Sequence, residues 1–376
     1  MTPDELKAAI SRLSLLRGAT AAINFHDADR NTFRDELLLL TDKIMLATIP
    51  ANPIHFNFLE NAVKLTTIWN KLLQDSNGYR LCDEMKLCIE SMISEWDPDS
   101  NGKIVVFTLG NYAVNKQKKD RYSKLVEILI AISKVYNVIF TKEPVFILVP
   151  DQFKDETLAN IVLFHEVGHF VDHDNALTDY VFEDVDNEIQ GNTKARILRE
   201  YFPGLYDKPL TTQTADLLRA HIEEYMADVF GAIYSHTHIL NYLDYLKGDT
   251  PNSYDEGHPS LSCRKKMVNS FISYCNNSRT SDHLLQYVIN AIEGATGKAV
   301  NKVDPPFTAD QYLNATVSLS TVQQMHALFV TPWDMLLEER KRLNLKTFPV
   351  DEYHKLRNTQ LYKDLDKVIK DSISRL

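Results

Sequence analysis

The sequence has no cysteine pattern that would crosslink a small secreted fold. Its four cysteines, at Cys82, Cys88, Cys263 and Cys275, form neither a CxxC pair nor a dense framework. Disulfides are typical of oxidising compartments, and closely spaced cysteine pairs are typical of structural metal sites. We therefore expect free thiols and a cytoplasmic location.

Long apolar runs, repeats and low-complexity tracts are missing as well. A membrane-spanning helix needs about 20 apolar residues, and no window approaches 18 uninterrupted ones. Residues 1–18 predict an amphipathic helix with early acidic residues, not a secretory signal. We expect a soluble protein with no membrane span.

The chain has fewer basic than acidic residues. It contains 41 Lys and Arg and 51 Asp and Glu, which gives a net charge of −10. Binding to the phosphate backbone of a nucleic acid needs a basic patch, and none is visible. The densest basic run, KQKKDR at 116–121, is interpreted as a solvated loop, and the acidic stretch 172–188 as a solvated excursion. No nucleic-acid partner is expected.

What is present is the composition of a globular protein, with 376 residues of which 44% are hydrophobic. Apolar residues recur at helical spacing, or cluster in short β-rich runs. The predicted helices are 33–49, 56–73, 81–96, 122–136, 155–174, 211–234, 331–343 and 350–376, with another opening at HPSLSCRKKM; the predicted strands are 104–109, 138–141 and 145–149. The turn-rich stretch 97–102 marks a boundary.

These elements predict an α+β fold that is mostly helical. We expect a zincin-like core at 99–303, in which a small sheet packs on the helix at 155–174. A helical N-terminal region at 1–98 and a helical C-terminal region at 304–376 flank that core. The order of the elements alone does not say what the flanking regions do.

The central motif is HEVGH, which begins at His165. His165 and His169 are four residues apart and share one face of a helix. Two such imidazoles can bind one Zn²⁺ at about 2.0–2.1 Å each. Glu166 is placed to act as general base on a water molecule. Gly168 is expected to let another backbone approach this helix.

A catalytic zinc site needs a third protein ligand. The motif HExxHxxGxxH would place it at position 175, which is Asn175, so that arrangement is excluded. Glu224 in EYMAD is preferred, because Asp228 follows one helical turn later and can orient a ligand histidine. Its rival Glu223 is followed at that spacing by Ala227, which can orient nothing.

The ordered motifs resemble those of the gluzincin metallopeptidases, and most closely the family of the membrane protease HtpX and the CAAX prenyl proteases. That family reads roughly DDELAAVLAHEIGH after a strand, and this chain reads DETLANIVLFHEVGH after VFILV. Its later HP motif with an arginine six residues after the histidine corresponds to His258, Pro259 and Arg264. The likeness covers about 144–267, and the membrane helices of that branch have no counterpart here.

The resemblance implies a zinc-dependent peptidase in which Glu166 moves the proton. His258 and Arg264 are then catalytic residues that stabilise the oxyanion. Arg264 could instead hold Asp228, and the HP pair could simply cap a helix beside a surface arginine. The strand VFILV, or its neighbour, would be the edge that pairs with an extended substrate.

Several further residues could bear on such a site. They are His173, His221, His236, His238, Tyr225 and Tyr254. We interpret His173 as a polar neighbour, His221 as a buried histidine, and the HxH pair as solvated. Tyr225 is expected to pack in the core, with oxyanion donation as the alternative for both tyrosines.

Two other functions stay open. The zincin core could bind or sense a partner without chemistry, although such a module needs neither Glu166 nor Asp228. Zinc-dependent hydrolysis of a non-peptide amide is the other. For the peptidase, we expect an endopeptidase, because no GxMEN-like stretch is present, with protein or peptide substrates. Access is expected to be restricted by the acidic stretch 172–188, or by the helical regions 1–98 and 305–376, which either occlude the cleft or select a regulatory partner.

Overall fold

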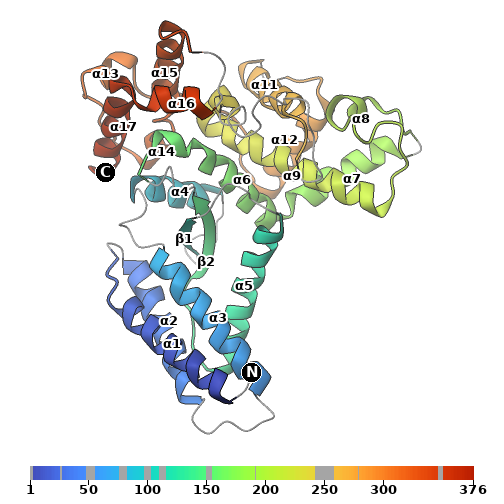
Figure 1. Ribbon diagram of the computed structural model, residues 1–376. Helices are drawn as coiled ribbons and strands as arrows, with labels where there is room; N and C mark the ends of the chain where they lie inside the picture. Colours follow the sequence, from blue (N-terminus) through green and yellow to red (C-terminus); the bar gives the residue numbers. More distant parts are fainter. Residues whose placement is uncertain are drawn as a thin grey trace. The chain divides into compact units, whose positions relative to one another are not determined.

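The computed structural model describes residues 3–25, 28–47, 56–75, 83–96, 103–109, 116–149, 155–190, 192–241, 258–277, 279–345 and 350–376 (Figure 1). Within these ranges the chain is mostly helical, and its only sheet has two strands. The chain forms two compact units, Met1–Lys86 with Pro98–Asp155, and Leu87–Asp97 with Glu156–Leu376. No helix in the described ranges has the length and apolar character needed to cross a membrane.

The first unit combines helices with the two-stranded sheet. Its elements are α1 (Pro3–Ala21), α2 (Ala28–Ala47), α3 (Phe56–Asp75), the start of α4 (Asp83–Trp96), β1 (Lys103–Leu109), α5 (Lys116–Val135) and β2 (Glu143–Val149). The strands are parallel, with Lys103 opposite Glu143 and Leu109 opposite Val149. Parallel neighbours need a crossover connection, and α5 lies in that connection.

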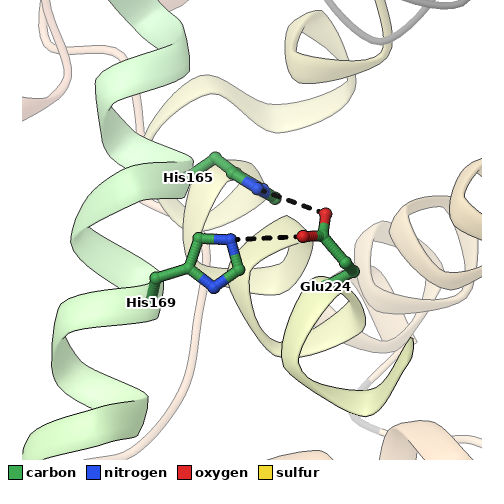
Figure 2. Close-up of side chains that lie close together, drawn as sticks. All are labelled: His165, His169 and Glu224. Carbon is green, nitrogen blue, oxygen red and sulfur yellow. Dashed lines mark ion pairs between the residues drawn. The ribbon is translucent and has the colours of Figure 1, made fainter. Parts of the chain in front are cut away.

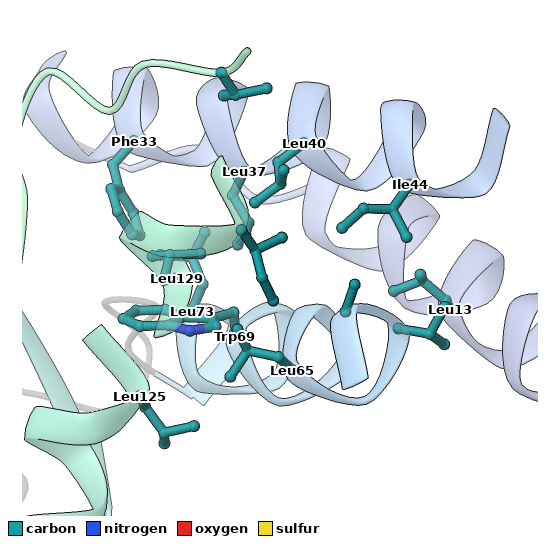
Figure 3. Packing of buried hydrophobic residues seen from close by; sticks show 14 of the residues in the cluster. Leu13, Phe33, Leu37, Leu40, Ile44, Leu65, Trp69, Leu73, Leu125 and Leu129 are labelled. Atoms are coloured by element: carbon teal, nitrogen blue, oxygen red, sulfur yellow. The ribbon is translucent and has the colours of Figure 1, made fainter. Parts of the chain in front are cut away.

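The core of the first unit is apolar (Figure 3). Leu37 and Leu40 of α2 face Trp69 of α3, and all three side chains are buried. Leu13 of α1 and Leu129 of α5 belong to the same cluster. Each helix contributes a stripe at the i, i+3, i+4 spacing that the sequence displays, so the periodicity accounts for this packing.

The described residues of the second unit form helices joined by turns and irregular segments, with no strand among them. Its elements are the end of α4, the 3-10 helix η4 (Leu158–Ile161), α6 (Val162–Asn175), α7 (Leu177–Ile189), α8 (Arg196–Tyr201), α9 (Thr212–Ser235), η5 (His236–His238), α11 (Leu261–Asn277), α12 (His283–Thr296), α13 (Ala309–Leu313), α14 (Val322–His326), α15 (Val330–Arg342), α16 (Val350–Arg357) and α17 (Gln360–Ile373). Helices α6 and α9 pack on each other along their length. This helix pair carries the candidate site.

A sharp corner joins α6 to α7. Ala176 ends α6 in the left-handed conformation, with φ of 52°. Asp172 then accepts hydrogen bonds from the backbone N–H and the hydroxyl of Thr178, both at 2.6 Å. These bonds satisfy a donor in the first turn of α7 and fix where the acidic helix begins.

The C-terminal helices hold the segment that leads into α6. Asp366 of α17 accepts hydrogen bonds from the backbone N–H of Thr157 at 2.8 Å and of Leu158 at 3.0 Å. Glu156 forms a bidentate ion pair with Arg357 and accepts a hydrogen bond from Tyr362 at 2.7 Å. We call these contacts to residues 156–158 the C-terminal clamp. The clamp fixes the start of the helix that carries HEVGH.

Most of the predicted elements are confirmed. These include the strands at 104–109 and 145–149, the long helix α9 and the helix that follows HPS. The α-helix with HEVGH begins at Val162 rather than at 155, because residues 158–161 form a 3-10 turn in which Asn160 is non-helical. The predicted helix 350–376 is interrupted after Arg357.

Three predictions are wrong. Residues 138–141 form no strand, and KQKKDR is the first part of α5 rather than a loop. The acidic stretch 172–188 is not a solvated excursion: it covers the end of α6, where Asp172 is buried, and most of α7, which buries Val181 and Val185 and leaves its acidic residues exposed or half-buried. An apolar stripe at helical spacing outweighed the acidic composition. The predicted turn at 97–102 lies outside the described residues.

Candidate metal centre

Helices α6 and α9 bring three potential metal ligands together (Figure 2). His165 and His169 project from α6 toward Glu224 of α9, and all three residues are buried. The Nε2 atom of His165 lies 3.6 Å from Oε2 of Glu224, and Nε2 of His169 lies 3.5 Å from Oε1. One ligand atom from each residue lies within 4.8 Å of the other two.

This spacing fits a divalent metal. In a tetrahedral zinc site with bonds of about 2.0–2.1 Å, ligand atoms are about 3.3–3.4 Å apart. The two nitrogen–oxygen distances at Glu224 are close to that value. Two imidazoles and a carboxylate are also a donor set that occurs in catalytic zinc sites. The group could therefore hold a metal ion.

Asp228 supports this geometry from behind His165. Its Oδ1 lies 3.1 Å from Nδ1 of His165, and its side chain is fully buried. A carboxylate at Nδ1 fixes the proton on that nitrogen and directs the lone pair of Nε2 toward the metal. The sequence predicted this role for Asp228 from its spacing to Glu224.

Arg264 of α11 joins the two acidic residues. It forms two hydrogen bonds with Asp228, at 2.7 and 2.6 Å, and its Nη1 lies 3.2 Å from Oε2 of Glu224. Arg264 is itself buried. This arrangement favours the interpretation that Arg264 holds Asp228, one of those left open by the sequence, and it excludes a surface arginine.

The charges of this cluster keep both acids ionised. Burial alone would raise the pKa of Glu224, but Arg264, His169 and His165 outweigh it and hold the pKa well below its usual range. Burial also opposes ionisation of Asp228, and Arg264 followed by His165 lowers its pKa nonetheless. Ionised carboxylates are the form in which these residues bind cations or orient a histidine.

Gly168 makes the approach of the two helices sterically feasible. A Cβ atom at this position would lie 2.7 Å from the Cα of Ala227 and 2.7 Å from the Cβ of Phe230. Real Cβ atoms do not approach other atoms so closely, so any larger residue would push α9 away from α6. The expectation that Gly168 admits a neighbouring backbone is confirmed.

The predicted catalytic residues surround the triad to different degrees. His258 lies with Nε2 3.7 Å from Oε1 of Glu224, and its side chain is 37% exposed, so it borders the site and faces solvent. Glu166 is half-buried and follows His165 on α6. Ser260, rather than the HP pair, caps α11, because its hydroxyl accepts the N–H of Cys263.

The remaining candidates lie outside the triad. His173 is exposed, and His221 is buried with its ring stacked on Phe202, as predicted. The prediction of a solvated HxH pair is wrong, because His238 is buried, stacks on Trp333 and pairs with Asp334 at 3.2 Å, while His236 contacts the carbonyl of Val303. Tyr225 is buried and donates to the carbonyl of Tyr201; Tyr254 lies outside the described residues.

The sequence did not predict the C-terminal clamp or the contact of Arg264 with Glu224. Both join residues from separate helices, and no spacing along the chain reports such pairs. Comparison of the chain with protein families, with curated proteins and with solved structures finds no match.

Proposed function

We propose that this protein is a zinc-dependent peptidase of the gluzincin type. The observation that carries the proposal is the buried set of His165, His169 and Glu224, with Asp228 behind it. A purely structural role would not require Glu166 beside two metal-binding histidines. The resemblance of HEVGH, EYMAD and HPSLSCR to the HtpX and CAAX protease family supports the same assignment.

Bound zinc would supply a Lewis acid that polarises a carbonyl group and acidifies water. Glu166 then accepts a proton from the attacking water and passes it to the leaving amine. His258 donates a hydrogen bond to the substrate oxygen as negative charge develops there. Arg264 keeps Asp228 in place, and Asp228 keeps His165 in the tautomer that binds metal.

The wider setting of the site belongs to the same proposal. A zincin-like core at 99–303 remains part of the proposal, and the enzyme would be an endopeptidase. The helical regions 1–98 and 304–376 would complete the core or hold a regulatory partner. The cytoplasmic location stays a prediction from the cysteine pattern; Cys88, Cys263 and Cys275 are free thiols in the structure.

The metal part of the proposal is tested by elemental analysis. Protein purified without chelator should contain about one zinc per chain, and His165→Ala should lose it. The exposed His173→Ala serves as the matched control and should keep its zinc. Metal-free protein that resists reconstitution, or a His165→Ala variant that keeps its metal, would contradict the assignment.

The catalytic part is tested by Glu166→Gln, which is nearly isosteric but cannot accept the proton. Peptide-library cleavage should fall by about 10²–10⁴-fold or more while zinc content and circular dichroism stay unchanged. A wild-type protein that binds zinc but cleaves no peptide would favour the binding module instead. Cleavage of non-peptide amides alone would instead favour the alternative of a zinc-dependent hydrolase that acts on a non-peptide amide.

A further inference from the structure

A groove of about 570 Å³ lies along α16 and α17, away from the metal ligands. Its wall includes Glu156, Tyr362 and Asp366, which also belong to the C-terminal clamp. The volume falls within the range of about 300–1,000 Å³ that is usual for small-molecule sites. The groove is therefore large enough for a compact ligand.

The groove reverses the charge of the rest of the chain. Four cationic side chains line it, those of Arg357, Lys363, Lys367 and Lys370, with the imidazole of His354 beside them. Three carboxylates also line the groove, so the cations are in excess by one even when the histidine is neutral. These carboxylates belong to Glu156, Asp366 and Asp371. The whole chain carries a net charge of −10, so this local excess of positive charge has the opposite sign.

Two of the three carboxylates are already engaged within the wall. Glu156 pairs with Arg357, and Asp366 pairs with Lys370 at 2.8 Å. Among the described residues, no carboxylate lies within ion-pair distance of the ammonium groups of Lys363 and Lys367, and both lysines are exposed. These two cations are available to a ligand.

The lysines also share one face of α17. Lys363, Lys367 and Lys370 are spaced at i, i+4 and i+7, which places them in one row along the helix. Like charges four residues apart destabilise a helix. A bound anion would remove that repulsion and would hold several ammonium groups at once.

We propose that this groove binds a small molecule that carries several phosphate groups, with Lys363 and Lys367 as its principal contacts. Several ammonium groups along one groove match the charge of such a ligand. The net charge of −10 disfavours a nucleic acid as the ligand, and the volume fits a small molecule rather than a polymer. The site is independent of the proposed peptidase function.

The groove shares residues with the C-terminal clamp, and the clamp precedes α6, the helix that carries His165 and His169. Arg357 lines the groove and holds Glu156, which stands shortly before η4 and α6. Phosphate groups compete with carboxylates for a guanidinium. A ligand that engages Arg357 therefore acts on the clamp that fixes the start of α6.

The test is isothermal titration of inorganic tripolyphosphate into the full-length chain at constant ionic strength. Wild type should bind with saturation, and Lys363→Gln with Lys367→Gln should weaken binding about tenfold or more, because charge-assisted hydrogen bonds are lost. The control variant, Lys194→Gln with Lys208→Gln, removes the same charge from exposed positions elsewhere and should stay within about twofold of wild type.

Absence of saturable binding to wild type would overturn the proposal. So would equal weakening in the two double variants, because that result indicates attraction by overall charge. Unchanged affinity in the Lys363 and Lys367 variant would place the binding elsewhere, the metal centre included, and would also overturn it. Since all four lysines are exposed, the variants should keep the circular dichroism of the wild-type fold.

Discussion

Both units have buried apolar residues, but the second unit also buries a cluster of ionisable residues between its helices. Around Trp69, the first unit packs apolar side chains such as Leu37 and Leu40 with no exposed surface. Between α6 and α9, the second unit buries Glu224 and Asp228 with two histidines and an arginine. Burying apolar surface stabilises a fold, whereas burying charge costs free energy that pairing only partly recovers.

This difference indicates where a metal ion could bind. A cluster of ionised acids around two histidines, with a single arginine, keeps a net negative charge in a buried site when the histidines are neutral. A divalent cation would neutralise that charge, and its binding would stabilise the folded unit by mass action. The cluster around Trp69 in the first unit is the contrasting case, because its buried side chains are apolar and stabilise the fold without binding a cation.

The largest expected effect comes from the apolar interior. Trp69→Ala should destabilise the first unit by about 3–5 kcal/mol, because it removes a fully buried aromatic side chain and leaves a cavity. Chemical denaturation measures the loss, and hydrogen exchange should locate it in α1–α3. The exposed Leu15→Ala is the control and should change little. Loss of zinc from folded Trp69→Ala protein would show that the two interiors are coupled.

The next largest effect concerns the approach of α6 to α9. Gly168→Ala places a methyl group against the backbone of Ala227, and such overpacking costs about 1–3 kcal/mol or more. We expect a lower melting temperature together with reduced zinc content. The control is Gly294→Ala on α12, where a Cβ meets nothing within 4 Å and should be neutral or stabilising. Equal behaviour of the two variants would contradict the close approach.

A smaller effect should separate orientation from charge. Asp228→Asn leaves the shape of the side chain intact but weakens its grip on His165, and we expect zinc affinity to fall by about 10–100-fold. Competition with a chromophoric chelator measures this affinity. Asp216→Asn removes an exposed acid from the same helix and should leave it unchanged. Wild-type affinity in Asp228→Asn would remove Asp228 from the metal centre.

The smallest effect is expected at the acidic surface. Changing Asp174, Asp179, Asp184 and Asp186 to Asn should cost less than about 1 kcal/mol, since exposed ion pairs such as Asp179–Arg219 contribute little. If the acidic stretch 172–188 restricts the access of substrates to the metal centre, the variant should digest casein up to about tenfold faster, because its local field is altered. Vigorous digestion by the unaltered protein would refute restriction, and an unchanged low rate in the variant would exclude the acidic face as its cause.

The sequence predicted the elements better than their environments. Helical spacing located α6 and α9, and the turn of helix between Glu224 and Asp228 predicted two acidic residues that the structure places beside His165. The acidic composition of 172–188 indicated a solvated excursion where an apolar stripe forms α7, and the position of the HxH pair after a helix indicated that His238 is solvated although it is buried. The apolar residues that bury them, such as Trp333 beside His238, lie on other helices. The residues adjacent in sequence therefore do not predict this burial.

By itself, the sequence determined which side chains share a helical face, because the geometry of one helix depends only on spacing. The spacing of four residues therefore predicted that His165 and His169 lie on the same face of one helix. Only the tertiary structure decided that α9 approaches α6 at Gly168, that Arg264 joins Asp228 to Glu224, and that Asp366 holds the backbone before α6. These contacts join distant segments, and they form only when whole helices pack, since each buried charge needs a partner that another helix supplies.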